Sequence, residues 1–124
     1  MMPSRGAVLA LLVVTSCGEK VDPGLECSVA GSVSFQDVKP IFEEHCLRCH
    51  STALVGPVAR NDAPSDINFD TYEDATAVIF LDETAADLAA QQLLQMSMPD
   101  DAPGSVPREQ VCSIVAWAKQ GTPE

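Results

Sequence analysis

The apolar residues nearest the C-terminus repeat with the period of an α-helix. Pro107 stands near the start of this segment, and Gly121 and Pro123 follow its end, as they commonly do beyond a helix. A helix in this segment would bury one apolar face against the rest of the chain. That face consists of Val111, Ile114, Val115 and Ala118, extended by Trp117.

Three earlier segments also predict helices. The stretch DVKPIFEEHCLRCH is expected to begin a helix with Asp37 as its N-cap, because Pro40 would then stand at the third helical position, where its missing N–H costs no hydrogen bond. Further helices are expected at about residues 72–80 and 84–95. No segment alternates between apolar and polar residues for long enough to predict a half-buried strand. The pattern therefore predicts an all-α fold of short helices.

The first sixteen residues have the pattern of a secretory signal peptide. Arg5 precedes an apolar run over residues 7–14, and small residues follow. The run is too short to cross a bilayer as a helix, which takes about 20 residues. The sequence Val-Thr-Ser-Cys at 14–17 resembles the lipobox of bacterial lipoproteins, in which the cysteine becomes the lipidated first residue. We expect lipidation at Cys17, with simple cleavage after a small residue as the alternative.

These features divide the chain into three parts. Residues 1–16 would be the signal peptide. Residues 17–31 carry Pro, Gly and charged residues without apolar periodicity, which is typical of a tether, here a lipid-anchored one. Residues 32–124 would form one folded domain, which is all that a chain of 124 residues allows. The protein is then expected to be exported to the bacterial periplasm or cell envelope and tethered to a membrane.

The charge of the chain is strongly acidic. It has 18 Asp and Glu against 7 Lys and Arg, a net charge of −11. This balance argues against nucleic acid or anionic lipid headgroups as partners and suits a basic partner protein better. The acidic residues are scattered along the chain, however, so a solvated surface without a partner is the preferred explanation for them.

The sequence HCLRCH at residues 45–50 holds both histidines of the chain and two of its five cysteines. Within it, Cys46-Leu47-Arg48-Cys49-His50 is C-x-x-C-H, the attachment motif of c-type haem. Two thiols three residues apart on a helical turn can form thioethers with the two vinyl groups of one porphyrin edge, and the next residue then brings an imidazole beneath the iron. Cys46 and Cys49 would bind the haem, with His50 as the proximal ligand.

Three other interpretations use the same residues. A structural zinc site needs a fourth ligand, and the chain has no second C-x-x-C or H-x-x-x-H pair to supply it. A thioredoxin-like dithiol would follow a strand in a βαβ pattern, whereas a helix precedes this motif. A plain disulfide between Cys46 and Cys49 would close a tight loop of a kind that is usually catalytic. Covalent haem is favoured over all three.

With this motif, the chain resembles the small single-haem c-type cytochrome domains of bacteria, of the class I kind found in exported lipoproteins. The resemblance runs from Val33 to Pro123 and rests on DVKPIFEEHCLRCH, FDTYEDA, MPD and IVAWAKQGTP. It implies a bundle of short helices around one covalent haem c, with His50 and a methionine as axial ligands. The chain departs from the family at Asp100, where a second proline is usual, and residues 51–70 carry no pattern that we can assign.

Three residues are candidates for the second axial ligand. His45 is disfavoured because it directly precedes Cys46, whose thioether would hold it at the porphyrin edge. Met98 is favoured because Pro99 biases it toward an extended backbone and ends the preceding helix, and because Met-Pro at this place is what the cytochrome resemblance would supply. Met96 would then point the opposite way along the segment and remains the alternative.

The odd number of cysteines is consistent with this assignment. Lipid would take Cys17 and haem would take two more, which leaves Cys27 and Cys112 to form a disulfide between the tether and the last helix. The alternative is that both remain free and buried.

With both axial positions filled by protein, the iron would have no open site for a substrate, so the expected function is electron transfer rather than catalysis. The expected partners are redox proteins, basic ones among them. No nucleic-acid partner is expected. Two alternatives remain open: a five-coordinate, peroxidase-like haem enzyme, and a haem-based gas or redox sensor.

Overall fold

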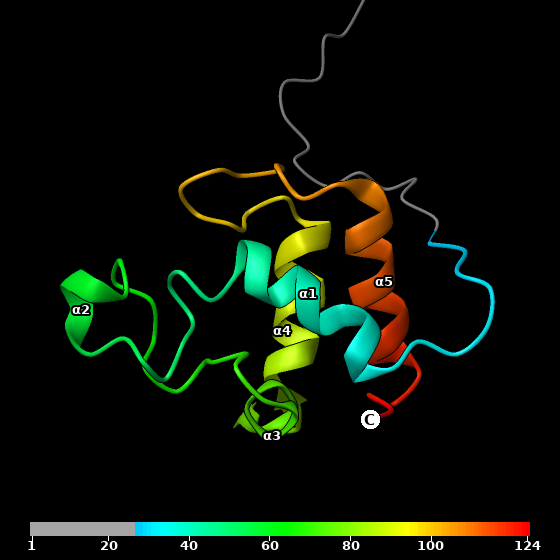
Figure 1. Cartoon of the computed structure of the whole chain (residues 1–124), viewed down its shortest axis with the longest axis horizontal. Coiled ribbons are helices and arrows are strands. Elements are labelled where there is room, and N and C mark those ends of the chain that lie inside the picture. Colours follow the sequence, from blue (N-terminus) through cyan, green and yellow to red (C-terminus); the bar gives the residue numbers. More distant parts are fainter. Residues whose placement is uncertain (1–26) are drawn as a thin grey trace, which may run out of the picture.

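Three helices form the centre of the molecule, which this computed structural model describes over residues 27–124. Helix α1 spans Phe35–His45, α4 spans Ala85–Leu94 and α5 spans Arg108–Lys119. α5 packs against both α1 and α4, and Figure 1 shows α1 lying across the other two. The segment expected to be a signal peptide and Cys17 lie outside the described residues. Within the described part, no helix has the length and apolar character needed to span a membrane.

The helices meet in a core of large apolar side chains. Trp117 and Ile114 of α5 and Phe42 and Val38 of α1 are fully buried. Phe42 stacks on Phe69, with the ring centroids 4.7 Å apart, and meets Trp117 edge to face. The predicted apolar stripe of the last helix is therefore confirmed as its core-facing side.

Helix α1 begins earlier than predicted. Its N-cap is Ser34, and Asp37 lies within the first turn, where its Oδ2 accepts hydrogen bonds from the Ser34 backbone N–H at 2.8 Å and from Oγ at 3.1 Å. The expectation of Asp37 as the N-cap was wrong because this side chain caps the helix from the third position, as in a capping box. Pro40 consequently lies inside the helix. The helix ends at His45, so the C-x-x-C-H motif follows it.

The all-α expectation holds only in part. The helix expected at 72–80 is a short helix α3, Tyr72–Thr76, followed by strand β1, Val78–Phe80, which pairs antiparallel with β2, Glu83–Thr84. Val, Ile and Phe in succession favour extended backbone over helix, which explains the change after Thr76. The third predicted helix is confirmed as α4, whose N-cap Thr84 accepts from the Asp87 backbone N–H.

The N-terminal end of the described chain contacts α5 through a pair of cysteines. The structure brings the sulfurs of Cys27 and Cys112 to disulfide-bonding distance, with the two Cα atoms 4.9 Å apart. These are the two cysteines that remain when Cys17 is assigned to lipid and Cys46 and Cys49 to haem. The contact joins the end of the expected tether to the last helix across a sequence separation of 85 residues.

Segment 51–70 forms a long loop on one side of the three-helix centre (Figure 1). It contains only the one-turn helix α2, Gly56–Ala59, which the sequence did not predict. Its two ends are held together, because the Phe69 N–H donates to the carbonyl of His50 at 3.0 Å. The loop therefore begins and ends beside the C-x-x-C-H motif.

Candidate functional site

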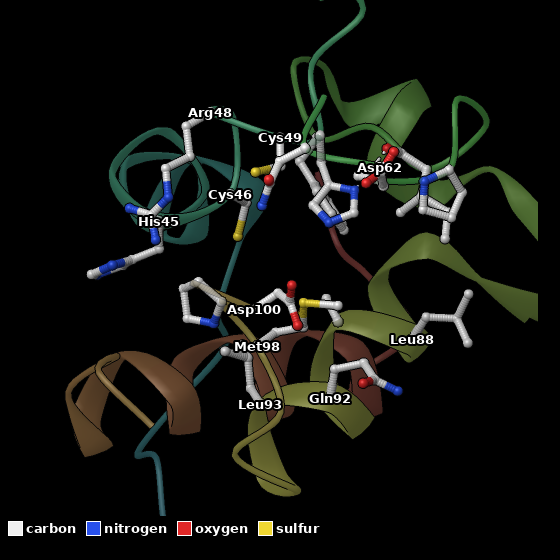
Figure 2. Close-up of a pocket in the computed structure, with 18 residues that line it drawn as sticks. His45, Cys46, Arg48, Cys49, Asp62, Leu88, Gln92, Leu93, Met98 and Asp100 are labelled. Carbon is white, nitrogen blue, oxygen red and sulfur yellow. Dashed lines mark hydrogen bonds between the residues drawn. The ribbon is translucent and has the colours of Figure 1, made fainter. Parts of the chain in front are cut away.

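A cavity of about 460 Å³ lies between the C-x-x-C-H turn, the long loop, α4 and the segment that follows α4. Cys46, Cys49, His50 and Met98, the four residues predicted to hold the cofactor, all line it. Figure 2 shows the two cysteines on one wall and Met98 on the wall that faces them. The remaining lining is mostly apolar, from Ile67, Phe69, Leu88, Ala89 and Leu93.

The two cysteines lie on a single helical turn beyond α1. The backbone N–H groups of Cys49 and His50 donate to the carbonyl of Cys46, at 3.1 and 2.8 Å. Both thiols are free. Burial raises the pKa of the Cys46 thiol to about 12, although the positive charge of Arg48 opposes the shift. So high a pKa disfavours the thiolate form of Cys46 itself.

The imidazole of His50 is positioned by contacts with Ile67 and Phe69. Its Nδ1 donates to the carbonyl of Ile67 at 3.1 Å, and its ring meets Phe69 edge to face, with centroids 5.7 Å apart. Burial lowers the pKa of His50; the hydrogen bond to Ile67 opposes this shift, and the charge of Arg60 adds to it. A neutral imidazole that donates through Nδ1 has its lone pair on Nε2, which is the arrangement of a metal-ligating histidine.

The two methionine candidates lie in different surroundings. Met98 is half-buried at the cavity and is followed by the buried Pro99. Met96 is 41% exposed and lines a second, smaller cavity, which Met98 also borders. Only Met98 of the two lines the cavity that holds His50. The assignment of Met98 rather than Met96 as a ligand stays a prediction.

His45 also touches the cavity, but its imidazole is engaged away from it. Nε2 of His45 donates to Oε1 of Gln110 on α5 at 2.7 Å. The contact ties the end of α1 to α5. His45 is thus a packing residue between helices in this structure.

Sequence reasoning missed the residues that shape the long loop. The buried guanidinium of Arg60 is only 3% exposed and holds the loop by hydrogen bonds. Its acceptors are the carbonyls of Ser51, Ala63, Pro64 and Ile67 and the side-chain oxygen of Asn68. A single arginine in a segment without apolar periodicity carries no signal that could have revealed this role.

A second polar contact closes the base of the loop. Asp70 accepts from the Ser51 hydroxyl at 2.6 Å and from the Thr52 backbone N–H at 2.8 Å. Partial burial alone would raise the pKa of Asp70, but these hydrogen bonds outweigh it and the pKa lies below its ordinary value. The carboxylate form therefore stabilises the start of the loop directly after His50.

Within residues 27–124, no three His, Cys, Asp or Glu side chains gather at one point. The cavity lining nevertheless brings together two cysteines, His50 and Met98, with Asp62 and Asp100 also on its walls. Comparison of the chain with protein-family models, with curated proteins and with solved structures found no match. The chemistry of these cavity residues is thus the basis for inferring a function.

Proposed function

We propose that this protein is an electron-transfer protein that binds one haem through thioethers to Cys46 and Cys49, with His50 and Met98 as axial ligands. One observation carries the proposal: a C-x-x-C-H turn and a methionine face each other across a single apolar cavity. A haem-binding site needs this combination of two thiols, an imidazole and a second ligand. The family resemblance of the sequence points the same way.

The residues present fit a haem group by chemistry and by space. The cavity volume lies in the range of cofactor and ligand sites, and its apolar walls suit a porphyrin. Cys46 and Cys49 present free thiols from one turn, which is what thioether formation requires. Filling the cavity would also cover apolar side chains that a molecule of this size otherwise leaves open to water.

Each residue would have a separate task. The cysteines would hold the group against loss outside the cell, and Ile67 would orient His50 through its carbonyl. Met98 would fill the second axial position and keep out small ligands. A bound haem supplies one-electron chemistry, and a site with two protein ligands carries it out without binding a substrate. A thioether ligand favours the reduced state, so we expect a relatively high potential.

The cellular setting belongs to the same proposal. The signal pattern and the expected lipid at Cys17 would place the domain in the bacterial periplasm or cell envelope, tethered to a membrane. Electrons would pass from a reduced partner protein to an oxidised one. The acidic surface suits basic partners that dock briefly through small interfaces.

The test is the mass of protein matured with a cytochrome c assembly system. We expect one added haem that survives acid-acetone extraction, and its loss in Cys46→Ser/Cys49→Ser. Freely extractable haem, or bound zinc in its place, would refute the proposal. Immediate binding of carbon monoxide by the reduced protein would instead favour the five-coordinate enzyme or sensor.

A further inference from the structure

Arg60 is a buried cation whose hydrogen bonds all go to neutral oxygens. It is 3% exposed, and its five acceptors are four backbone carbonyls and one amide side chain. The ion pairs within residues 27–124 join other side chains, and none includes Arg60. A buried charge without a carboxylate is costly, even when it is fully hydrogen-bonded.

Arg60 and His50 share one acceptor. Nη2 of Arg60 and Nδ1 of His50 both donate to the carbonyl oxygen of Ile67, each at 3.1 Å. A carbonyl has two lone pairs and can accept both bonds. Because Arg60 also bonds to Pro64 and Asn68 on either side of Ile67, it fixes the direction in which that carbonyl points. The orientation of the His50 ring thus depends on Arg60, which makes no hydrogen bond to that ring.

Neutral hydrogen-bond donors could hold the loop without the free-energy cost of burying a charge, so the charge of Arg60 needs an explanation. Its nearest functional neighbour is His50, one shared carbonyl away. When a metal bound to His50 gains one electron from a partner protein, the net charge of the site becomes less positive by one. A positive charge close by favours that change.

We propose that Arg60 is a positioning residue that orients His50 through the Ile67 carbonyl, and that its charge raises the reduction potential of the haem iron bound to His50. The proposal rests on the function proposed above. It assigns a role to segment 51–70, whose sequence indicated none.

Asn68 allows the charge to be cancelled while Arg60 stays in place. Its Oδ1 accepts from Nη2 of Arg60 at 3.0 Å, and its Nδ2 donates to the carbonyl of Ser65 at 3.0 Å. Asn68→Asp puts a carboxylate beside the guanidinium at almost unchanged size. Both variants lose the hydrogen bond from Nδ2 to Ser65. Asn68→Ala leaves the charge of Arg60 uncompensated, which makes it the matched control.

The readout is the midpoint potential of the haem-loaded protein. At a fixed applied potential, we expect the ratio of reduced to oxidised protein to be about tenfold lower in Asn68→Asp than in Asn68→Ala, a difference of about 59 mV for one electron. Equal potentials in the two variants would overturn the electrostatic part of the proposal.

Substitution of Arg60 itself gives a second comparison. Arg60→Met should lower the ratio as Asn68→Asp does, whereas Arg60→Lys, which keeps the charge, should stay within about twofold of the wild type. Lys119→Gln removes an exposed charge at the end of α5 and should change nothing. If Arg60→Met does not mature, the two Asn68 variants decide the question alone.

The positioning role is tested in haem-free protein. Nitrogen NMR of the His50 ring should show one tautomer, protonated at Nδ1, in the wild type and a mixture in Arg60→Met and Arg60→Lys. An unchanged tautomer in both variants would overturn this role. Because these spectra need no haem, they separate a failure of this inference from a wild type that never acquires haem, which would refute the proposed function instead.

Discussion

Arg48 donates a hydrogen bond from Nη2 to Oδ1 of Asp101 at 2.6 Å. The first residue lies between Cys46 and Cys49, and the second lies three residues after Met98. The ion pair therefore joins the turn that would carry the thioethers to the loop that would carry the axial methionine, from one side of the cavity to the other.

Breaking this ion pair should loosen Met98. Both side chains are almost half exposed, so the pair is worth roughly 0.2–1 kcal/mol, and Asp101→Asn should make an added ligand such as imidazole displace Met98 up to about fivefold more readily. The measurement is a spectroscopic titration of the oxidised protein. Lys39→Met, which breaks the exposed Lys39–Glu43 pair on α1, is the control and should have no effect. Identical titrations in both variants would contradict the prediction.

Met98 and Met96 can be distinguished by substitution. Met98→Ala should abolish the far-red sulfur-to-iron band of the oxidised protein and lower its potential, because the thioether ligand is lost. Met96→Ala should leave both nearly intact, since Met96 does not line the cavity that holds His50. The opposite pattern would assign the ligand to Met96. Retention of the band in both variants would reopen the five-coordinate alternatives.

The Cys27–Cys112 disulfide should contribute substantially to stability. Its loop spans 85 residues, for which the chain-entropy account gives about 4.5 kcal/mol. Cys27→Ser/Cys112→Ser should lower the free energy of unfolding by about that amount, as measured by denaturant titration. Peptide mapping without reduction provides the direct check, and two free thiols at these positions would disprove the bond.

Asp70 should make the loop sensitive to acid. Its pKa is lower in the folded protein than in the unfolded chain, so its contribution to stability is present above about pH 4 and is lost as the pH falls below that value. Asp70→Asn should lower the free energy of unfolding by about 1 kcal/mol at neutral pH and flatten its decline in acid. Asp66→Asn, an exposed change in the same loop, should behave as the wild type. Parallel acid profiles for all three proteins would exclude this role.

Cys17 should determine partitioning between membrane and soluble fractions. Cys17→Ser should release the exported protein from the membrane fraction, because the thiol is the expected attachment point of the lipid. Cell fractionation with immunoblotting measures this. If the variant stays with the membrane, the lipid anchor is wrong.

The sequence was most informative where side chains alone determine the structure. The apolar spacing of Val111, Ile114 and Val115 predicted α5. The C-x-x-C-H spacing predicted that Cys46, Cys49 and His50 share one site, and all three line the cavity. The loop of residues 51–70 could not be predicted in this way, because Arg60 binds mainly backbone carbonyls. Every residue carries a carbonyl, so the acceptors leave no pattern in the sequence. The helix expected at 72–80 failed for a different reason, since local β preference at 78–80 outweighed helical spacing.

The contact between Cys27 and α5 also bears on how the domain would be oriented at a membrane. Figure 1 shows residues 27–33 running beside α5, with the loop of residues 51–70 on the far side of α1. A chain anchored in a bilayer would therefore enter the domain away from this wall of the cavity. If Cys17 carries the proposed lipid and the cavity the proposed haem, a partner protein could approach the wall of residues 51–70 from the side opposite the membrane attachment.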